Sequence, residues 1–143
     1  MASPIPVILC GRTERIGAGV IEALQPEIEV IHFVLTPEAG KTQIPALLRG
    51  EKEVTSDSGL GSKNYERAVE AVLLGAGYSD EEVEEMREAS AGIKSMPWLR
   101  PDTSKPAPPL GPEYGKALVA RIKKTLKELN EKGNMSKDAV VWY

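Results

Sequence analysis

The chain of 143 residues contains a single cysteine, Cys10, and a single histidine, His32. One cysteine cannot form an internal disulfide bond, and one cysteine with one histidine cannot supply the ligands of a structural zinc site. No apolar run reaches the roughly 20 residues that a helix needs to cross a bilayer. No basic segment precedes the first short apolar run, so we expect no signal peptide and a cytoplasmic protein without a membrane partner.

Charge of either sign is not in large excess. The sequence has 18 basic and 21 acidic residues, which gives a formal net charge of -3. A general nucleic-acid-binding protein carries a basic face, so nucleic acid is not an expected partner. The chain is long enough for one core, and we find neither an internal repeat nor a linker. We therefore predict a single domain over residues 1–143.

The most informative stretch is the N-terminal third of the chain. Residues 5–10 (IPVILC) form a short apolar run that is typical of a buried strand. A glycine-spaced turn follows and opens a helix that ends before Pro26, and residues 29–35 form a second apolar strand. Strand, helix and strand within about thirty residues make a βαβ unit with a right-handed crossover. We therefore predict an α/β fold, a small Rossmann-like three-layer domain with a mostly parallel sheet flanked by helices.

Weaker patterns follow this unit. Thr36 and Pro37 can begin a helix, which Pro45 is expected to divide into two short turns. Ser79 and Glu82 form a capping box for a helix that ends near Ser90. The remaining expectations are a loop at 56–62, a helix at 64–74, a strand at 93–99, a proline-rich loop at 100–112, a helix at 113–132 and a strand at 138–143.

The turn after the first strand is the predicted ligand site. Its residues are Gly11, Arg12, Thr13, Glu14, Arg15, Ile16 and Gly17. We expect backbone N–H groups from Thr13 to Gly17 to face the phosphates of a nucleotide, because a helix N-terminus favours anions. Gly11 is expected to adopt a backbone angle that other residues avoid, and Gly17 to let the helix approach the strand. The plainer alternative is that the glycines only form a turn.

The segment from Cys10 to Gly17 resembles the opening of the short-chain dehydrogenase/reductase family. That family has Thr-Gly-x-x-x-Gly-Ile-Gly at the same turn between strand and helix. Gly11 matches the first glycine, and Ile16 and Gly17 match the last pair. Arg15 replaces the middle glycine and Cys10 replaces the threonine. The resemblance covers the N-terminal third only, and it implies a dinucleotide-binding fold for that stretch.

The sequence favours NADP as the nucleotide. Sites that prefer NAD place an acidic residue at the end of the second strand, where it holds the ribose 2′-hydroxyl. Counted from Gly11 by the resemblance, that position falls at Val34, Leu35 and Thr36, none of which is acidic, and Glu38 is the nearest acidic residue. Arg12 and Arg15 could instead pair with a 2′-phosphate, although solvated arginines are the alternative interpretation. A small CoA-binding domain has the same opening and remains a second hypothesis.

The catalytic pattern of the resembled family is absent. That family uses a tyrosine and a lysine four residues apart, which share one face of a helix. The residues four positions after Tyr65, Tyr78 and Tyr114 are Val69, Glu82 and Leu118, and Tyr143 ends the chain. We therefore predict an NADP(H)-binding or sensing protein without autonomous catalysis and with no assignable catalytic residue. The alternative is a minimal oxidoreductase completed by oligomerisation.

Other reactive side chains have simpler interpretations. His32 lies inside an apolar strand and is expected to be a hydrogen-bonded core residue. Cys10 is either a small buried side chain or a thiol activated by the helix N-terminus. The helix at 79–90 is acidic and the helix at 113–132 is rich in lysine and arginine. These complementary charges could support a homodimer or another partner.

Overall fold

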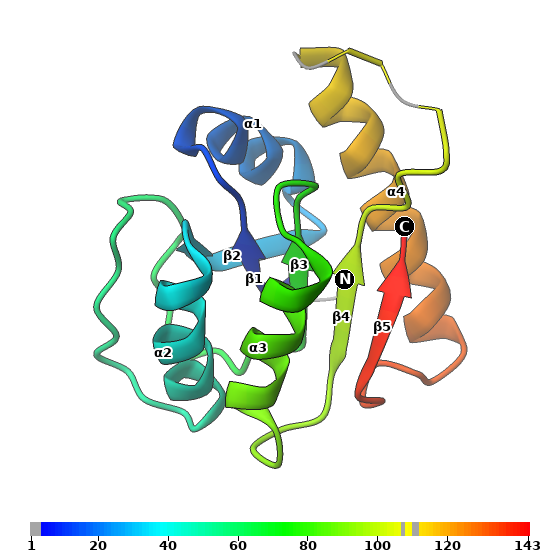
Figure 1. Cartoon of the computed structure of the whole chain (residues 1–143). Helices are drawn as coiled ribbons and strands as arrows, with labels where there is room; N and C mark the ends of the chain where they lie inside the picture. Colours follow the sequence, from blue (N-terminus) through cyan, green and yellow to red (C-terminus); the bar gives the residue numbers. More distant parts are fainter. Residues whose placement is uncertain (1–3, 107, 110–111) are drawn as a thin grey trace.

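A computed structural model describes residues 4–106, 108–109 and 112–143 of the chain. Within these residues, five parallel strands form one sheet in the order β2-β1-β3-β4-β5, and four helices flank it (Figure 1). The strands are β1 (Ile5–Cys10), β2 (Ile28–Val34), β3 (Ala71–Leu74), β4 (Pro97–Arg100) and β5 (Ala139–Trp142). The helices are α1 (Glu14–Leu24), α2 (Pro37–Leu48), α3 (Asp80–Ser90) and α4 (Pro112–Glu131). This arrangement confirms the predicted three-layer α/β fold.

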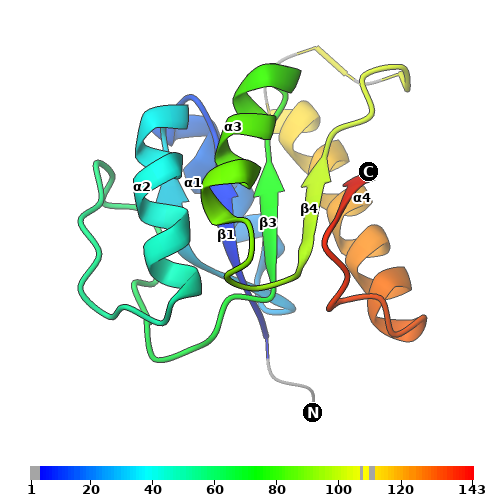
Figure 2. The same cartoon turned by 60° about the horizontal axis from the view of Figure 1, so that its bottom comes forward.

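The sheet separates two hydrophobic cores. Alternate residues of β1 point to opposite faces, so Val7 and Leu9 enter one core while Ile8 and Cys10 enter the other. Side chains from α1 and α4 complete the first core, and side chains from α2 and α3 complete the second. Figure 2 shows α2 and α3 side by side on one face of the sheet and α4 on the opposite face.

The connection through α4 differs from the other three in hand. The path from β1 through α1 to β2 runs in one direction along the sheet, and the paths through α2 and α3 run in the other direction on the other face. These three connections therefore share one hand. The path from β4 to β5 continues in the direction of the α2 and α3 paths, but α4 lies on the α1 face. It therefore has the opposite hand, in contrast to the single hand found in about 98% of such connections.

Several predicted elements are confirmed at their ends. Thr36 is the N-cap of α2, where its hydroxyl accepts a hydrogen bond of 3.1 Å from the N–H of Ala39. Ser79 and Glu82 make both hydrogen bonds of the capping box at the start of α3. Gly133 follows α4 with a φ of 71°, a conformation that suits glycine. The proline-rich loop lies before α4, and its positions 107, 110 and 111 fall outside the described residues.

Two predicted elements are wrong. The helix expected at 64–74 is absent, and its last four residues form β3, the central strand of the sheet. These residues are fully buried on both faces, and a short apolar run of this kind does not reveal its period. The expected division at Pro45 is also absent, since α2 runs through it. Pro45 and its neighbours Ile44 and Leu47 are buried, so packing against the sheet holds the helix despite the missing N–H.

The strand expected at residues 93–99 is observed as the shorter strand β4, which spans Pro97–Arg100. Pro97 is the first residue of β4, a position where the missing N–H does not interrupt a ladder of hydrogen bonds.

No helix among the described residues is long and apolar enough to cross a bilayer.

Candidate functional site

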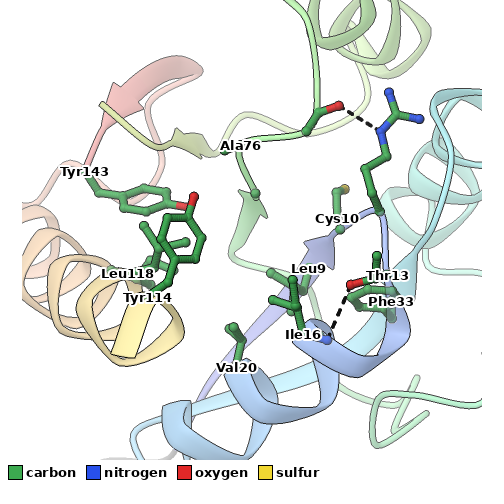
Figure 3. A pocket seen from close by; sticks show the side chains of 16 residues that line it. Leu9, Cys10, Thr13, Ile16, Val20, Phe33, Ala76, Tyr114, Leu118 and Tyr143 are labelled. Carbon is green, nitrogen blue, oxygen red and sulfur yellow. Dashed lines mark hydrogen bonds between the residues drawn. The ribbon is translucent and has the colours of Figure 1, made fainter. Parts of the chain in front are cut away.

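A cavity of about 350 Å³ opens at the carboxyl ends of β1 and β3 (Figure 3). The chain leaves these two neighbouring strands toward opposite edges of the sheet, since β1 leads to β2 and β3 leads to β4. Such a switch point is where open α/β sheets bind their ligands. The cavity is lined by Leu9, Cys10, Gly11, Arg12, Thr13, Ile16, Gly17, Val20, Phe33, Gly75, Ala76, Gly77, Tyr114, Leu118, Ile122 and Tyr143.

The walls of the cavity are mainly apolar. Ile16 and Val20 project from α1, and Leu118 projects from α4 on the opposite side (Figure 3). Ile16 is 43% exposed, which is unusual for a large apolar side chain in this protein. A cavity of this size with apolar walls suits a ring system rather than a strongly hydrated group.

Two tyrosines supply hydroxyl groups to the lining. Figure 3 shows Tyr114 from α4 and Tyr143 from the end of the chain lying close together. The hydroxyl of Tyr143 donates a hydrogen bond of 2.6 Å to the carbonyl of Leu74, and burial raises the pKa of Tyr143. Tyr114 is half-buried, and its hydroxyl has no hydrogen-bond partner within the described part of the chain. Of the two hydroxyls, that of Tyr143 is therefore bonded within the fold, and that of Tyr114 makes no hydrogen bond to a described residue.

The N-terminus of α1 lies at the rim of the cavity. Thr13 is the N-cap, and its hydroxyl accepts a hydrogen bond of 3.4 Å from the N–H of Ile16. The N–H of Gly17 donates to the carbonyl of Thr13 at 3.1 Å. The expectation that all amides from Thr13 to Gly17 face a phosphate is therefore wrong for these last two. The amides of Glu14 and Arg15 have no partner among the described residues and remain available to an anion.

The two glycines of the predicted motif make room for Phe33. A Cβ atom at Gly17 would lie 2.5 Å from the ring of Phe33, and a Cβ atom at Gly11 would lie 3.1 Å from it. Gly17 thus lets α1 approach the sheet, as predicted. The prediction of an unusual backbone angle at Gly11 is wrong, because its φ lies outside the left-handed region. Its small size instead avoids a tight contact with the aromatic ring on β2.

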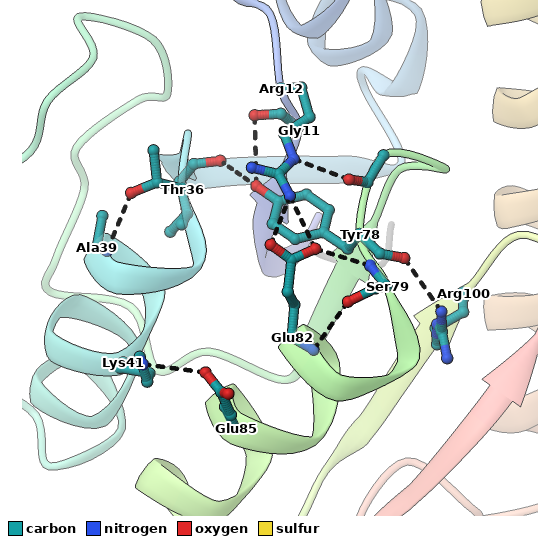
Figure 4. Close-up of polar contacts among 12 residues, drawn as sticks. Gly11, Arg12, Thr36, Ala39, Lys41, Tyr78, Ser79, Glu82, Glu85 and Arg100 are labelled. Carbon is teal, nitrogen blue, oxygen red and sulfur yellow. Dashed lines mark hydrogen bonds and ion pairs between the residues drawn. The ribbon is translucent and has the colours of Figure 1, made fainter.

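Arg12 is held by the loop between β3 and α3 (Figure 4). Its Nε donates a hydrogen bond of 2.8 Å to the carbonyl of Gly77, and its terminal nitrogen contacts both carboxylate oxygens of Glu82 at 2.8 Å. A Cβ atom at Gly77 would lie 2.5 Å from Cγ of Arg12, so this position must be small. The guanidinium also lies 4.6 Å from the ring centre of Tyr78. Arg12 therefore joins the two loops that border the cavity.

Tyr78 supports the same turn from below. Its hydroxyl is directed at the carbonyls of Val34, at 3.2 Å, and Gly11, at 3.4 Å. Burial raises the pKa of Tyr78, so its hydroxyl stays protonated and can donate. The capping box identified Glu82 from the sequence, but nothing in the sequence indicated its contact with Arg12, 70 positions away.

The structure brings together only part of the predicted site. The lining includes Gly11, Arg12, Thr13, Ile16 and Gly17, whereas Glu14, Arg15 and Thr36 lie outside it. Glu14 and Arg15 are exposed on the first turn of α1. The sequence interpretation missed Phe33, the loop at 75–77, Tyr114 and Tyr143. The glycines at 75 and 77, close after an apolar run, were the available signal for that loop.

His32 and Cys10 are core residues. The imidazole is fully buried, with Nδ1 at 2.8 Å from the hydroxyl of Tyr65 and Nε2 at 2.7 Å from Oε1 of Gln43. Burial lowers the pKa of His32, which keeps the ring neutral. Cys10 is fully buried and burial raises the pKa of its thiol to about 12, which favours the small buried side chain over an activated thiolate. Among the described residues there is no cluster of three or more potential metal ligands.

Comparison with known proteins gives one informative match. No family model matches the sequence, and no solved structure matches it. Kojic acid related protein 6 of Aspergillus oryzae (strain ATCC 42149 / RIB 40) is 42% identical over 140 residues, which cover 95% of this chain and 84% of that protein. The chain therefore belongs to the same protein family as Kojic acid related protein 6.

Proposed function

We propose that this protein is a small cytoplasmic nucleotide-binding protein that takes NADP(H) in the cavity at the β1/β3 switch point. The observation that carries the proposal is the position of an apolar cavity directly beside the N-terminus of α1. Apolar walls would hold a ring of the cofactor, and the amides of Glu14 and Arg15 would hold its phosphates. The cofactor would supply hydride chemistry if the protein catalyses a reaction.

The choice of NADP over NAD depends on Arg15. Arg12 is already paired with Glu82, so its guanidinium is not available for a 2′-phosphate without breaking that pair. Arg15 is exposed and has no ion-pair partner within the described residues. No acidic residue stands at the end of β2, where an NAD site would place one, and Thr36 there caps α2. A single exposed guanidinium favours the phosphorylated cofactor modestly.

A binding or sensing role suits the side chains at the cavity better than catalysis. The hydroxyl of Tyr114 has no lysine four residues along α4, where Leu118 stands instead. Tyr114 nevertheless lines the cavity, and this observation favours an oxidoreductase, completed by a partner subunit, as the second candidate. CoA is a third candidate, since it also combines a pyrophosphate with a phosphorylated ribose.

Calorimetric titration of the 143-residue protein would test the proposal. The panel contains NADPH, NADH, CoA and flavin mononucleotide, because flavodoxin shares the strand order 2-1-3-4-5. Kojic acid is included because the relative is named after it. We expect NADPH to bind most tightly. Failure of all the nucleotides to bind would overturn the proposal, and preferential binding of CoA would support the third candidate.

A variant that blocks the cavity tests whether NADPH binds there. Ala76 lies in the exposed loop that lines the cavity, so Ala76→Trp should fill the cavity without disturbing the core. Ala18→Trp is the matched control, since Ala18 is exposed on α1 and lies outside the lining. We expect NADPH binding to be lost in Ala76→Trp only. Unchanged binding in a folded Ala76→Trp protein would place the ligand elsewhere.

A further inference from the structure

The two edge strands of the sheet, β2 and β5, differ in whether another segment covers their outer side. The outer edge of β2 is covered by the loop at 60–63, where the N–H groups of Ser62 and Lys63 donate to the carbonyls of Val30 and Ile31 at 2.9 Å. The outer edge of β5 has no comparable cover among the described residues. An uncovered edge can accept a further strand, and proteins usually protect such edges.

The hydrogen-bonding groups on this edge can be assigned. The N–H of Tyr143 donates to the carbonyl of Arg100, and the carbonyl of Tyr143 accepts from the N–H of Asp102. Residues alternate along a strand, so Val141 also faces β4, whereas Val140 and Trp142 direct their N–H and carbonyl groups away from the sheet. These groups are the ones that an added strand would bind.

One face of β5 is also uncovered. Because α4 lies on the α1 face, no helix among the described residues covers β5 on the α2/α3 face, as Figure 1 shows. The side chain of Trp142 is 52% exposed there, with the guanidinium of Arg100 at 4.8 Å from its ring centre. Val140 is half-buried on the same face. Sheets of parallel strands are normally covered on both faces, so this apolar surface is exceptional.

On the face of the sheet that α1 and α4 cover, positively charged side chains lie beside β5. A groove of about 360 Å³ runs between α4 and β5. It is lined by the cations Lys105, Arg121, Lys124 and Lys132, with Glu128 as the acidic residue among the lining. Arg121 is held by the carbonyl of Pro106, and the three lysines have no ion-pair partner within the described part of the chain. The groove therefore suits negatively charged side chains.

We propose that the outer edge of β5 binds an extended acidic segment of a partner protein as a sixth strand. Its alternate side chains would be acidic toward Lys124 and Lys132, and apolar toward Val140 and Trp142. A second copy of this chain suits the edge less well. Antiparallel pairing of two β5 strands would bring two lysine-rich α4 helices together on one face, which is repulsive.

A labelled peptide of alternating glutamate and valine is the probe, and a peptide of alternating lysine and valine is its control. We expect the fluorescence anisotropy of the acidic peptide to rise when the 143-residue protein is added, and that of the basic peptide to stay unchanged. Equal binding of both peptides, or binding of neither, overturns the proposal. Added salt should weaken binding of the acidic peptide.

Three variants test separately whether peptide binding depends on the hydrogen-bonding edge of β5, on its apolar face and on the lysines of the groove. Val140→Pro removes an outward N–H and keeps the bonds to β4, so we expect at least a tenfold loss of peptide affinity. Trp142→Thr tests the apolar face if Val140→Pro fails to fold. Lys124→Glu combined with Lys132→Glu should reverse the preference, so that the protein binds the basic peptide more tightly than the acidic one. Wild-type affinity in folded Val140→Pro and Trp142→Thr proteins would contradict the proposal.

Two controls complete the test. The cavity variant Ala76→Trp should bind the acidic peptide normally, because Ala76 lines the cavity and does not line the groove beside β5. Light scattering reports the mass of the protein alone. A dimer that Val140→Pro dissociates would show that a second copy occupies the edge, and the proposal of an acidic partner would then be wrong.

Discussion

The guanidinium of Arg12 contacts both carboxylate oxygens of Glu82 at 2.8 Å across 70 positions of sequence. The same carboxylate accepts a hydrogen bond of 2.8 Å from the N–H of Ser79, so it serves both the capping box of α3 and the turn before α1. The pKa of Glu82 is lowered first by the bond from Ser79 and then by the bond from Arg12. These contacts fix the two loops that border the cavity.

The first prediction concerns Glu82 and pH. A carboxyl group whose folded pKa lies below the ordinary value of 4.5 stabilises the fold above that pH, and this stabilisation is lost as the pH falls through the folded value. Wild type should therefore melt at a higher temperature than Glu82→Gln at pH 7. The difference should shrink below about pH 4.5.

Melting curves from pH 7 to pH 3 would check this, with Glu81→Gln as the matched control. Glu81 is exposed on the same turn of α3 and makes no ion pair with any described residue. A difference between wild type and Glu82→Gln that stays constant with pH would contradict the assigned contacts.

The second prediction compares two glycines of α1. A methyl group at Gly17 would clash with Phe33, so Gly17→Ala should lower the free energy of unfolding by about 1–3 kcal/mol. Gly19→Ala meets no atom within 4 Å and should be neutral or stabilising by up to about 1 kcal/mol. Denaturant unfolding measures both. Introducing Phe33→Leu should reduce the penalty of Gly17→Ala, and equal effects of the two glycine variants would refute the packing argument.

The sequence predicted the elements that have strong local signals. The first strand, the glycine turn and the second strand were recognised because apolar runs and glycine spacing act within a few residues. The same local signals failed at residues 71–74, where four buried apolar residues fit either a helix or a strand. Only the packing of β1 and β4 on both sides decides that this segment is the central strand.

The cavity could be predicted only in part, because its walls come from distant segments. Gly11 and Gly17 are close in sequence, and the turn they form was identified. Tyr114 reaches the cavity because α4 lies on the α1 face, whereas Tyr143 reaches it because alternation along β5 points its side chain to that face. General rules of topology favour the opposite hand for the last connection, so sequence reasoning would have placed Tyr114 elsewhere.

The third prediction is that the isolated protein has no appreciable NADPH-dependent turnover of common aldehydes and ketones. A positioned proton donor typically contributes roughly 10²–10⁴-fold to a rate, and Tyr114 has no lysine at the four-residue spacing. The decrease of NADPH absorbance measures turnover. Robust activity that is lost in Tyr114→Phe but kept in Tyr65→Phe, a variant beside His32 in the other core, would identify an enzyme instead.

The fourth prediction concerns cofactor preference. Arg15→Ala should weaken NADPH binding about tenfold and leave NADH binding unchanged, because the loss of one charge-assisted hydrogen bond corresponds to about 1.4 kcal/mol. Lys127→Ala changes the net charge equally, and Lys127 lies on the exposed side of α4. Calorimetry with both cofactors measures the effect. Equal weakening of NADPH and NADH by Arg15→Ala would remove the argument from the 2′-phosphate.

The most direct test of the central claim is a nuclear magnetic resonance titration of ¹⁵N-labelled protein with NADPH. The proposed site predicts the largest shifts at the amides of Glu14 and Arg15 and in the loop at 75–77, with little change at Val140 and Trp142 on the outer edge of β5. Absence of shifts at saturating NADPH, or shifts confined to residues away from the cavity, would contradict nucleotide binding at the β1/β3 switch point.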